Sequence, residues 1–256
     1  MTHKFKSSSI GVSSSRISKM VVIGHRGAPS QAPENTIPSF LKAIDVGVDL
    51  IELDVRSSRD GFLVVIHDER VDRTTDSEGL VSRFTLEELR SMDAGSWFSP
   101  GFKGVKIPTF EEVLNLAKGR VSVAVDLKET GIEGRVLKLL RSYGLVYGSM
   151  VIAPPEVGRR VKVSEPRITI QADLNVRGGF EGSVDELVKS LVDIASIHIE
   201  ELSSDVVKYC HKRGLLVNTW TVNTVEDVLR CVEAEVDFIT TDTPKLVIET
   251  LRGKDL

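Results

Sequence analysis

The chain has 256 residues, 41% of them hydrophobic, and a formal net charge of −4. This length suits a single well-buried domain, and α/β barrels commonly reach it. The acidic balance excludes a non-specific nucleic-acid binder, and no apolar run approaches the roughly 18 residues of a membrane span.

Residues 1–20 differ in composition from the rest of the chain. They are rich in serine, with four basic and no acidic side chains. No continuous apolar core is present, so we do not expect a secretory signal. We expect an N-terminal tail, and three interpretations stay open: an inert tail, a segment upstream of a natural start at Met20, or a flap that reaches towards an anionic substrate.

Eight short apolar runs follow, with helical patterns between most of them, which predicts βα units and a parallel sheet. Eight such units favour a (β/α)8 TIM barrel over residues 21–256. An open doubly wound sheet is the alternative, but no glycine-rich dinucleotide loop follows the first strand. We predict strands at 21–24, 50–55, 121–127, 149–153, 167–173, 194–199, 215–221 and 236–241, and helices at 36–46, 109–118, 131–142, 182–191, 203–213, 223–233 and 244–252.

Helix boundaries carry two local signals. Asn223 followed by Glu226 resembles a capping box, and Thr243-Pro244 resembles an N-cap with proline in the first turn. The stretch 154–162 is the weakest of the helical segments, because two prolines open it.

The second predicted strand continues into "RSSRDGFLVVIHD", a further β-like run. A parallel crossover needs a dozen or more residues, so we predict an antiparallel hairpin with Asp60-Gly61 as a two-residue loop. That loop pairs residues whose numbers sum to 121, which places Asp54 opposite His67, on the face that carries Glu52. Residues 68–108 then form a small insertion, which we expect to be a lid or substrate-binding element.

Polar and aromatic side chains gather where the predicted strands end, which in a barrel is the catalytic face. Burying an unpaired charge is costly, so several such groups on one face indicate an active site rather than packing. They are His25 and Arg26, Glu52 and Asp54 with His67, Asp126 and Lys128, His198, Trp220 and Asp242.

Three of these groups, Glu52, Asp54 and Asp126, are hard oxygen ligands with no cysteine nearby, which favours one divalent cation, Mg²⁺ or Ca²⁺. The alternative is a hydrogen-bonded carboxylate cluster satisfied by Arg56 or Lys128.

The remaining groups suit phosphate chemistry. Arg26 and Lys128 supply positive charge for an oxyanion such as phosphate. His25 and His67 can act as general base and general acid near neutral pH. For His198, lining of the pocket and a structural role both stay open.

Long, ordered motifs then point to a family. "GHRGAPSQAPENTIPSF", "GVDLIELDVRSSRDGFLVVIHDERVDRTT", "LRSMDAGSWF", "KIPTFEEVL", "NTWTVN" and "VDFITTDTP" together resemble the glycerophosphodiester phosphodiesterases, from Val21 to about Pro244. The resemblance implies a metal-dependent barrel enzyme that hydrolyses small-molecule glycerophosphodiesters to an alcohol and sn-glycerol 3-phosphate. The substrate's own 2-hydroxyl attacks first in such a scheme, giving a cyclic phosphate that water opens.

The resemblance also implies a role for each matching residue. These roles are acid–base catalysis for His25 and His67, metal binding for Glu52 and Asp54, phosphate contact for Arg26 and Lys128, and lining of the glycerol pocket for Trp220. Three positions depart from the family pattern. Asp126 stands where glutamate is usual as third metal ligand, Ala153-Pro154 replaces a Ser-Phe pair, and Glu235 replaces a common glycine, which we expect to be a surface change.

Other functions stay open beside this one. A wide apolar groove beside Trp97, Phe98 and Phe102 would favour a lysophospholipase D. A catalytically silent phosphate-ligand-binding barrel is a second alternative, and a sugar-phosphate isomerase or aldolase a third. Cys210 and Cys231 lack metal-ligand spacing, so we expect reduced thiols in a cytoplasmic protein. Metal identity, the leaving alcohol and any homo-oligomer stay undetermined.

Overall fold

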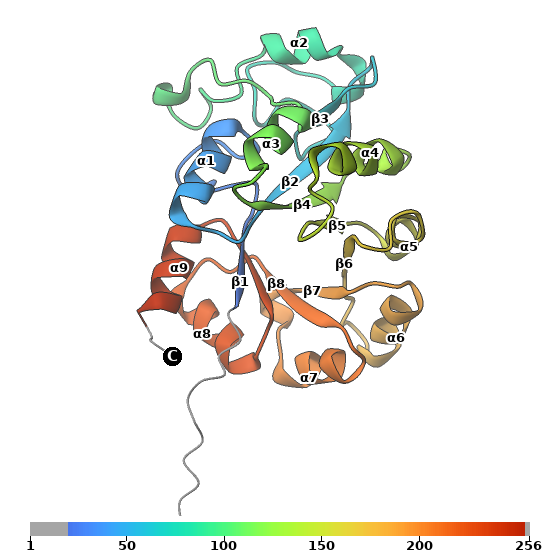
Figure 1. The fold of residues 1–256 in the computed structure, drawn as a ribbon. Coiled ribbons are helices and arrows are strands. Elements are labelled where there is room, and N and C mark those ends of the chain that lie inside the picture. The colour runs from blue at the N-terminus through green and yellow to red at the C-terminus, as the bar shows by residue number, and fades with distance from the viewer. Residues whose placement is uncertain (1–19, 254–256) are drawn as a thin grey trace, which may run out of the picture.

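The computed structural model describes residues 20–253, so the predictions for the N-terminal tail lie outside the described residues, except at Met20. The chain forms a closed barrel of parallel strands surrounded by helices, which confirms the predicted TIM barrel (Figure 1). Neighbouring strands follow the order β1-β9-β8-β7-β6-β5-β4-β2, and pairing of β1 with β2 closes the ring.

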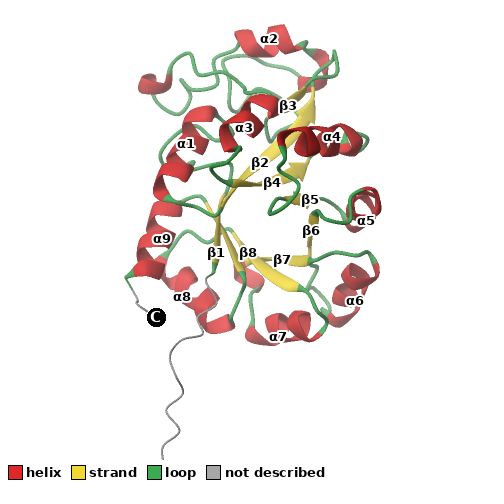
Figure 2. Cartoon of the chain, viewed as in Figure 1, coloured by secondary structure: helices red, strands yellow, loops and turns green. Residues whose placement is uncertain are grey.

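Figure 2 shows the alternation of strands and helices along the chain. The strands are β1 (Val21–Gly24), β2 (Leu50–Ser57), β3 (Leu63–Val65), β4 (Ser122–Leu127), β5 (Met150–Ile152), β6 (Thr169–Asp173), β7 (Ile194–His198), β8 (Leu216–Trp220) and β9 (Phe238–Thr241). The helices are α1 (Ile37–Val46), α2 (Leu86–Ser91), α3 (Phe110–Ala117), α4 (Glu133–Tyr143), α5 (Pro155–Ser164), α6 (Glu181–Lys189), α7 (Ser204–Lys212), α8 (Val225–Ala234) and α9 (Pro244–Arg252).

Alternation along β2 separates the core from the site. Ile51, Leu53 and Val55 belong to the large apolar cluster between barrel and helices, whereas Leu50 belongs to a small separate cluster. Successive side chains of a strand point to opposite faces, so Glu52 and Asp54 share the inward face of Leu50, nearer the carboxyl end. The small cluster fills the barrel interior below them and consists of Ile23, Leu50, Ala124, Met150 and Ile194.

The hairpin forms, but its predicted register is wrong by one residue. Val55 pairs with Val65 and Ser57 with Leu63, so the backbone N–H of Ile66, not of His67, donates to Asp54 O at 3.0 Å. The connecting loop is one residue longer than predicted, with Gly61 in the left-handed region at φ +86°. Three-residue hairpin loops with such a residue are common, and the added residue shifts every pair.

The segment between β3 and α3 carries α2 and two short 3₁₀ segments, at 81–83 and 100–102. It lies beyond β2 and β3, at the top of Figure 1. A small apolar cluster joins it to the hairpin and consists of Val64, Ile66, Val71, Val81, Leu89, Met92, Ala94 and Ile107. Because Val64 lies on β3, this cluster packs the segment against that strand.

One helix start differs from the sequence signals. The segment 154–162, the weakest of the predicted ones, does form a helix: α5 begins at Pro155 with Pro154 as its N-cap, because the first helical residue needs no N–H donor. Helix α8 is capped by Thr224, whose Oγ1 accepts from Asp227 N at 3.1 Å, so the predicted Asn223 capping box is wrong. Asn223 instead donates from Nδ2 to Asp242 Oδ2 at 2.8 Å, which withdraws its side chain from the helix end. At α9, Thr243 precedes Pro244 as predicted, without a side-chain cap bond.

Both cysteines are free and buried, and burial raises the pKa of Cys210 to about 11 and that of Cys231 to about 12. The thiolate is the reactive form, so both are poor nucleophiles at neutral pH. Within residues 20–253, no helix combines the length and apolar character needed to cross a membrane.

Helices α4 and α8 are each followed by a residue in the left-handed conformation, a glycine after α4 and a glutamate after α8. The two positions therefore allow a matched test of stability. Gly144 follows α4 at φ +72°, and Glu235 follows α8 at φ +60°. The side chain of Glu235 is exposed, which confirms that its replacement of the family's glycine is a surface change. A side chain in this conformation is strained, so we expect Glu235→Gly to stabilise the fold by about 1 kcal/mol and Gly144→Ala to destabilise it by about 1 kcal/mol. Urea unfolding measures both, and equal signs for the two changes would contradict this account.

Candidate active site

The first strand delivers its two polar residues through a tight turn between two glycines. Gly27 N donates to Gly24 O at 3.1 Å, and Gly27 has φ +93°. A Cβ on Gly27 would clash with Ser39 Oγ and the backbone of α1, and a Cβ on Gly24 would clash with Gly27 O. Both glycines are therefore needed for His25 and Arg26 to stand at the mouth of the barrel.

Arg26 has a left-handed backbone, at φ +51°. Its N–H donates to Glu52 Oε2 at 2.7 Å, and its carbonyl accepts from Asn35 N at 3.0 Å and from Ser39 Oγ at 2.9 Å. Asn35 is itself left-handed, at φ +56°. Two strained residues that hold each other beside a buried acid are typical of a functional site.

Glu52, Asp54 and Asp126 converge as the sequence predicts. Strands β2 and β4 are neighbours with Asp54 in register with Asp126, and each acid offers one oxygen within 4.8 Å of the others. Only 3% of Glu52 and 1% of Asp54 are exposed. Three hard oxygen donors of this kind fit one divalent cation.

Basic groups neutralise part of this charge. Lys128 Nζ lies 3.0 Å from Asp54 Oδ1 and 2.7 Å from Asp126 Oδ2, and Arg26 Nε lies 3.3 Å from Asp54 Oδ2. Burial would raise the pKa of Asp54, but these cations outweigh it and lower that pKa. For Glu52, burial and the charge of Asp54 raise the pKa to about 8. The basic side chains therefore leave Glu52 uncompensated, which a bound cation would correct.

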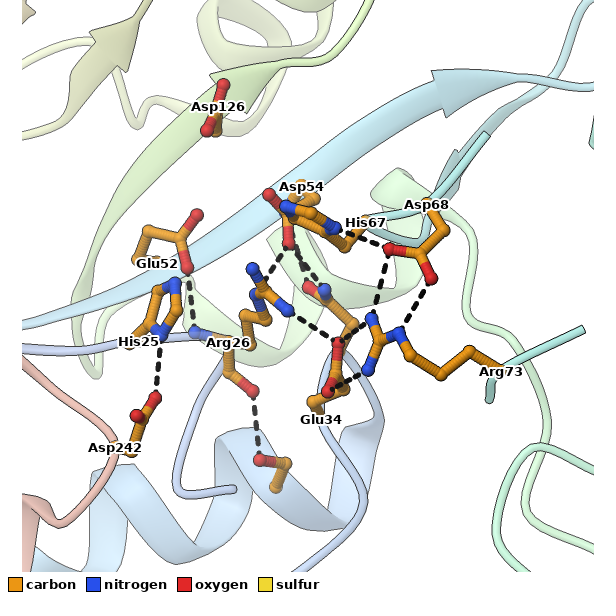
Figure 3. A network of polar contacts seen from close by, with 12 residues as sticks. His25, Arg26, Glu34, Glu52, Asp54, His67, Asp68, Arg73, Asp126 and Asp242 are labelled. Atoms are coloured by element: carbon orange, nitrogen blue, oxygen red, sulfur yellow. Dashed lines mark hydrogen bonds and ion pairs between the residues drawn. The ribbon is translucent and has the colours of Figure 1, made fainter. Parts of the chain in front are cut away.

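His25 lies beside Glu52 in Figure 3, and its Nδ1 is 2.7 Å from Asp242 Oδ1. Burial would lower the pKa of His25, but the hydrogen bond to Asp242 and the charge of Glu52 raise it above its usual value. An ionised carboxylate only accepts, so Nδ1 carries the hydrogen and Nε2 is left for chemistry. Asn223 holds the other oxygen of Asp242.

His67 lies beside Asp54 in Figure 3 although the predicted pairing fails, because the chain leaves β3 at Val65 and turns. His67 Nδ1 is 2.7 Å from Asp68 Oδ1, and Arg73 bonds both oxygens of Asp68. The pKa of Asp68 lies below its usual value, and the hydrogen bond from Arg73 is the largest cause. His67 thus also presents Nε2, on the far side of the acids from His25.

His198 and Trp220 lie at the ends of β7 and β8, where their rings pack edge to face with centroids 5.4 Å apart. His198 Nδ1 accepts from Glu200 N at 3.4 Å, which caps the 3₁₀ segment 199–201. These contacts give His198 a structural role, and its contact with substrate stays a prediction, as does that of Trp220.

Sequence reasoning assigned no role to several residues that hold the site together. Asp242 was recognised only as the end of a strand, although it orients His25. Glu34 accepts from both Arg26 and Arg73, and Asn35 donates from Nδ2 to Asp54 Oδ2 at 2.6 Å. Their signal was present, because Glu34, Asn35, Asp68 and Arg73 all stand inside the motifs that carry the family resemblance.

The closed parallel barrel carries buried acids, two oriented histidines and two basic side chains at the carboxyl ends of its strands. This arrangement is typical of TIM-barrel enzymes. The model of the glycerophosphoryl diester phosphodiesterase family matches residues 25–144 and 160–246. A glycerophosphodiester phosphodiesterase from Caldanaerobacter subterraneus is 37% identical over 91% of this chain and 98% of its own length.

Solved structures agree with this match. A glycerophosphodiester phosphodiesterase from Agrobacterium tumefaciens has a TM-score of 0.80 and 29% identity, covering 89% of this chain and 98% of that one. A phosphodiesterase from Oleispira antarctica in complex with the product sn-glycerol-3-phosphate has a TM-score of 0.82 and 26% identity, covering 91% and 96%. The chain therefore belongs to the glycerophosphoryl diester phosphodiesterase family, as the motifs indicated, and is an enzyme of that family.

The contact between His25 and Asp242 is testable by itself. In Asp242→Asn the hydrogen-bond partner remains but its charge is lost, so the imidazolium is less stabilised and the pKa of His25 should fall. An NMR titration of the histidine ring signals measures this, with His211 on α7 as the internal reference. A pKa of His25 that stays constant or rises would contradict the assigned role of Asp242.

Proposed function

We propose that this enzyme hydrolyses glycerophosphodiesters to an alcohol and sn-glycerol 3-phosphate, with one divalent cation and with His25 and His67 as the acid–base pair. The observation that carries the proposal is the acidic cluster of Glu52, Asp54 and Asp126 between the two histidines (Figure 3). The product bound to the Oleispira antarctica relative supports the same substrate class.

Two basic side chains at the mouth of the barrel would bind the phosphate. Arg26 Nε and Lys128 Nζ lie 3.3 and 3.0 Å from Asp54, so both would contact a phosphate bound to a cation that the three acids hold. Glu52, Asp54 and Asp126 would hold Mg²⁺ or Ca²⁺, which supplies positive charge that polarises a phosphoryl oxygen. Arg26 and Lys128 add charge where the transition state becomes more negative.

Proton transfer falls to the histidines. In the first step one neutral Nε2 takes the proton of the substrate's 2-hydroxyl, while the other, protonated Nε2 gives its proton to the departing alkoxide. In the second step the roles reverse: the second Nε2, now neutral, takes a proton from water, and the first gives its proton back to the 2-oxygen as the cyclic phosphate opens. Asp242 and Asp68 keep each Nδ1 protonated, so that each Nε2 stays available.

His25→Ala and His67→Ala should each lower kcat at least 100-fold, the usual scale of acid–base catalysis. Release of glycerol 3-phosphate from glycerophosphocholine measures it. His211→Ala is the control, because the end of α7 lies at the opposite end of the barrel and this change should preserve kcat. Near-normal turnover of either site variant would refute the scheme, and faster cleavage of lysophosphatidylcholine would favour the lysophospholipase D.

Cation binding should depend on pH through Glu52. The pKa of about 8 means that protons compete with the cation below that value, so affinity should rise between pH 6 and 8 and level off above. Calorimetric titration of the protein, stripped of metal by EDTA, with Mg²⁺, Ca²⁺ or Mn²⁺ measures it. Glu52→Gln should weaken binding and flatten the pH dependence. A steep dependence that survives in Glu52→Gln would assign the competing proton to another group.

A further inference from the structure

One arginine outside the barrel joins the two halves of the site. Arg73 follows β3 in the loop before α2, and its guanidinium bonds two carboxylates at once. Nε and Nη2 donate to the two oxygens of Asp68 at 2.6 and 3.1 Å. Nη1 and Nη2 donate to the two oxygens of Glu34 at 2.8 Å each. Both contacts are bidentate, a geometry that only the planar fork of arginine provides.

Each carboxylate bonded by Arg73 also holds a group assigned to chemistry. Asp68 Oδ1 lies 2.7 Å from His67 Nδ1, and Glu34 Oε1 accepts from Arg26 Nη1 at 2.8 Å. The bonds therefore run without interruption from the phosphate-binding Arg26 to the imidazole of His67, as the dashed lines of Figure 3 trace.

We propose that Arg73 is a positioning residue, which fixes the ring of His67 through Asp68 and ties that ring to Arg26 through Glu34. The proposal rests on the function proposed above for His67. The segment after β3 then helps to set the geometry of the reaction. Arg73 does so through Asp68 and does not touch the reacting atoms itself.

Two features favour orientation over plain stability. The Arg73 side chain is 46% exposed, and its hydrogen bonds go to Asp68 and Glu34. These carboxylates in turn hold His67 and Arg26, so the loss of Arg73 acts first on those two side chains. The backbone of His67 is held separately, because Arg56 Nε donates to His67 O at 2.9 Å. Rotation of the imidazole is then the main remaining freedom, and Asp68 restricts it only while Arg73 holds Asp68.

Arg73→Met should lower kcat on glycerophosphocholine about 10- to 100-fold, the scale seen when partners that orient a site residue are removed. KM should change less than about threefold, since Arg26 keeps its contacts with Asp54 and Glu34. Arg73→Lys should recover only part of kcat, because an ammonium cannot bond both carboxylates in bidentate fashion. Arg70→Met is the matched control, since Arg70 stands in the same loop and pairs with Asp72 instead, so kcat should stay unchanged.

A double-mutant cycle separates positioning from a general structural loss. In a His67→Asn background, Arg73→Met should cause no further fall in kcat, because the group that Arg73 positions is already gone. An equal fall in both backgrounds would overturn the proposal, as would normal kcat in Arg73→Met.

A measurement without turnover keeps this test independent of the proposed function. Two-dimensional ¹H–¹⁵N spectra of protein with labelled histidine report which ring nitrogen carries the hydrogen. We expect the Nδ1-protonated form at His67 in the wild type, and a mixture of the two forms in Arg73→Met with the signal of His211 unchanged. Unchanged His67 signals would overturn the positioning role. If the wild type releases no glycerol 3-phosphate, the proposed function fails, and these spectra alone decide the role of Arg73.

Discussion

The placement of three carboxylates inside the barrel is the constraint on which the rest of the site depends. Glu52, Asp54 and Asp126 offer oxygens within 4.8 Å of one another, two of them from almost fully buried residues. Like charges removed from water cannot all stay ionised without compensation. The backbone N–H of Arg26 and the ammonium of Lys128 each compensate part of that charge. A cation bound at Glu52 would compensate the rest.

The two histidines are oriented by the same device, built twice from unrelated parts of the chain. His25 is held through Nδ1 by Asp242, which follows β9 and is steadied by Asn223. His67 is held through Nδ1 by Asp68, which is steadied by Arg73. In both cases an aspartate with a partner of its own selects the tautomer that presents Nε2. The barrel supplies one of these supports and the segment after β3 supplies the other.

Most of the fold was predictable because its signals are local. Apolar runs that alternate with helical patterns gave the barrel, and strand ends gave Glu52, Asp54 and Asp126 as neighbours. The hairpin register was not predictable, because a loop of two or of three residues suits Asp60-Gly61 equally well and only the packing of β3 on β2 selects between them. The cap of α8 was misassigned because Asn223 has a stronger partner distant in sequence, Asp242.

The sequence by itself determined the barrel, its catalytic end and the family, because periodicity, strand-end chemistry and motif order are all written along the chain. Tertiary structure alone decided how the groups are held. The bonds from Arg73 to Glu34 cross 39 positions and that from His25 to Asp242 crosses 217, so no local pattern encodes them. Hydrogen bonds need atoms within about 3 Å of each other, and only the closing of the barrel brings such distant residues that close.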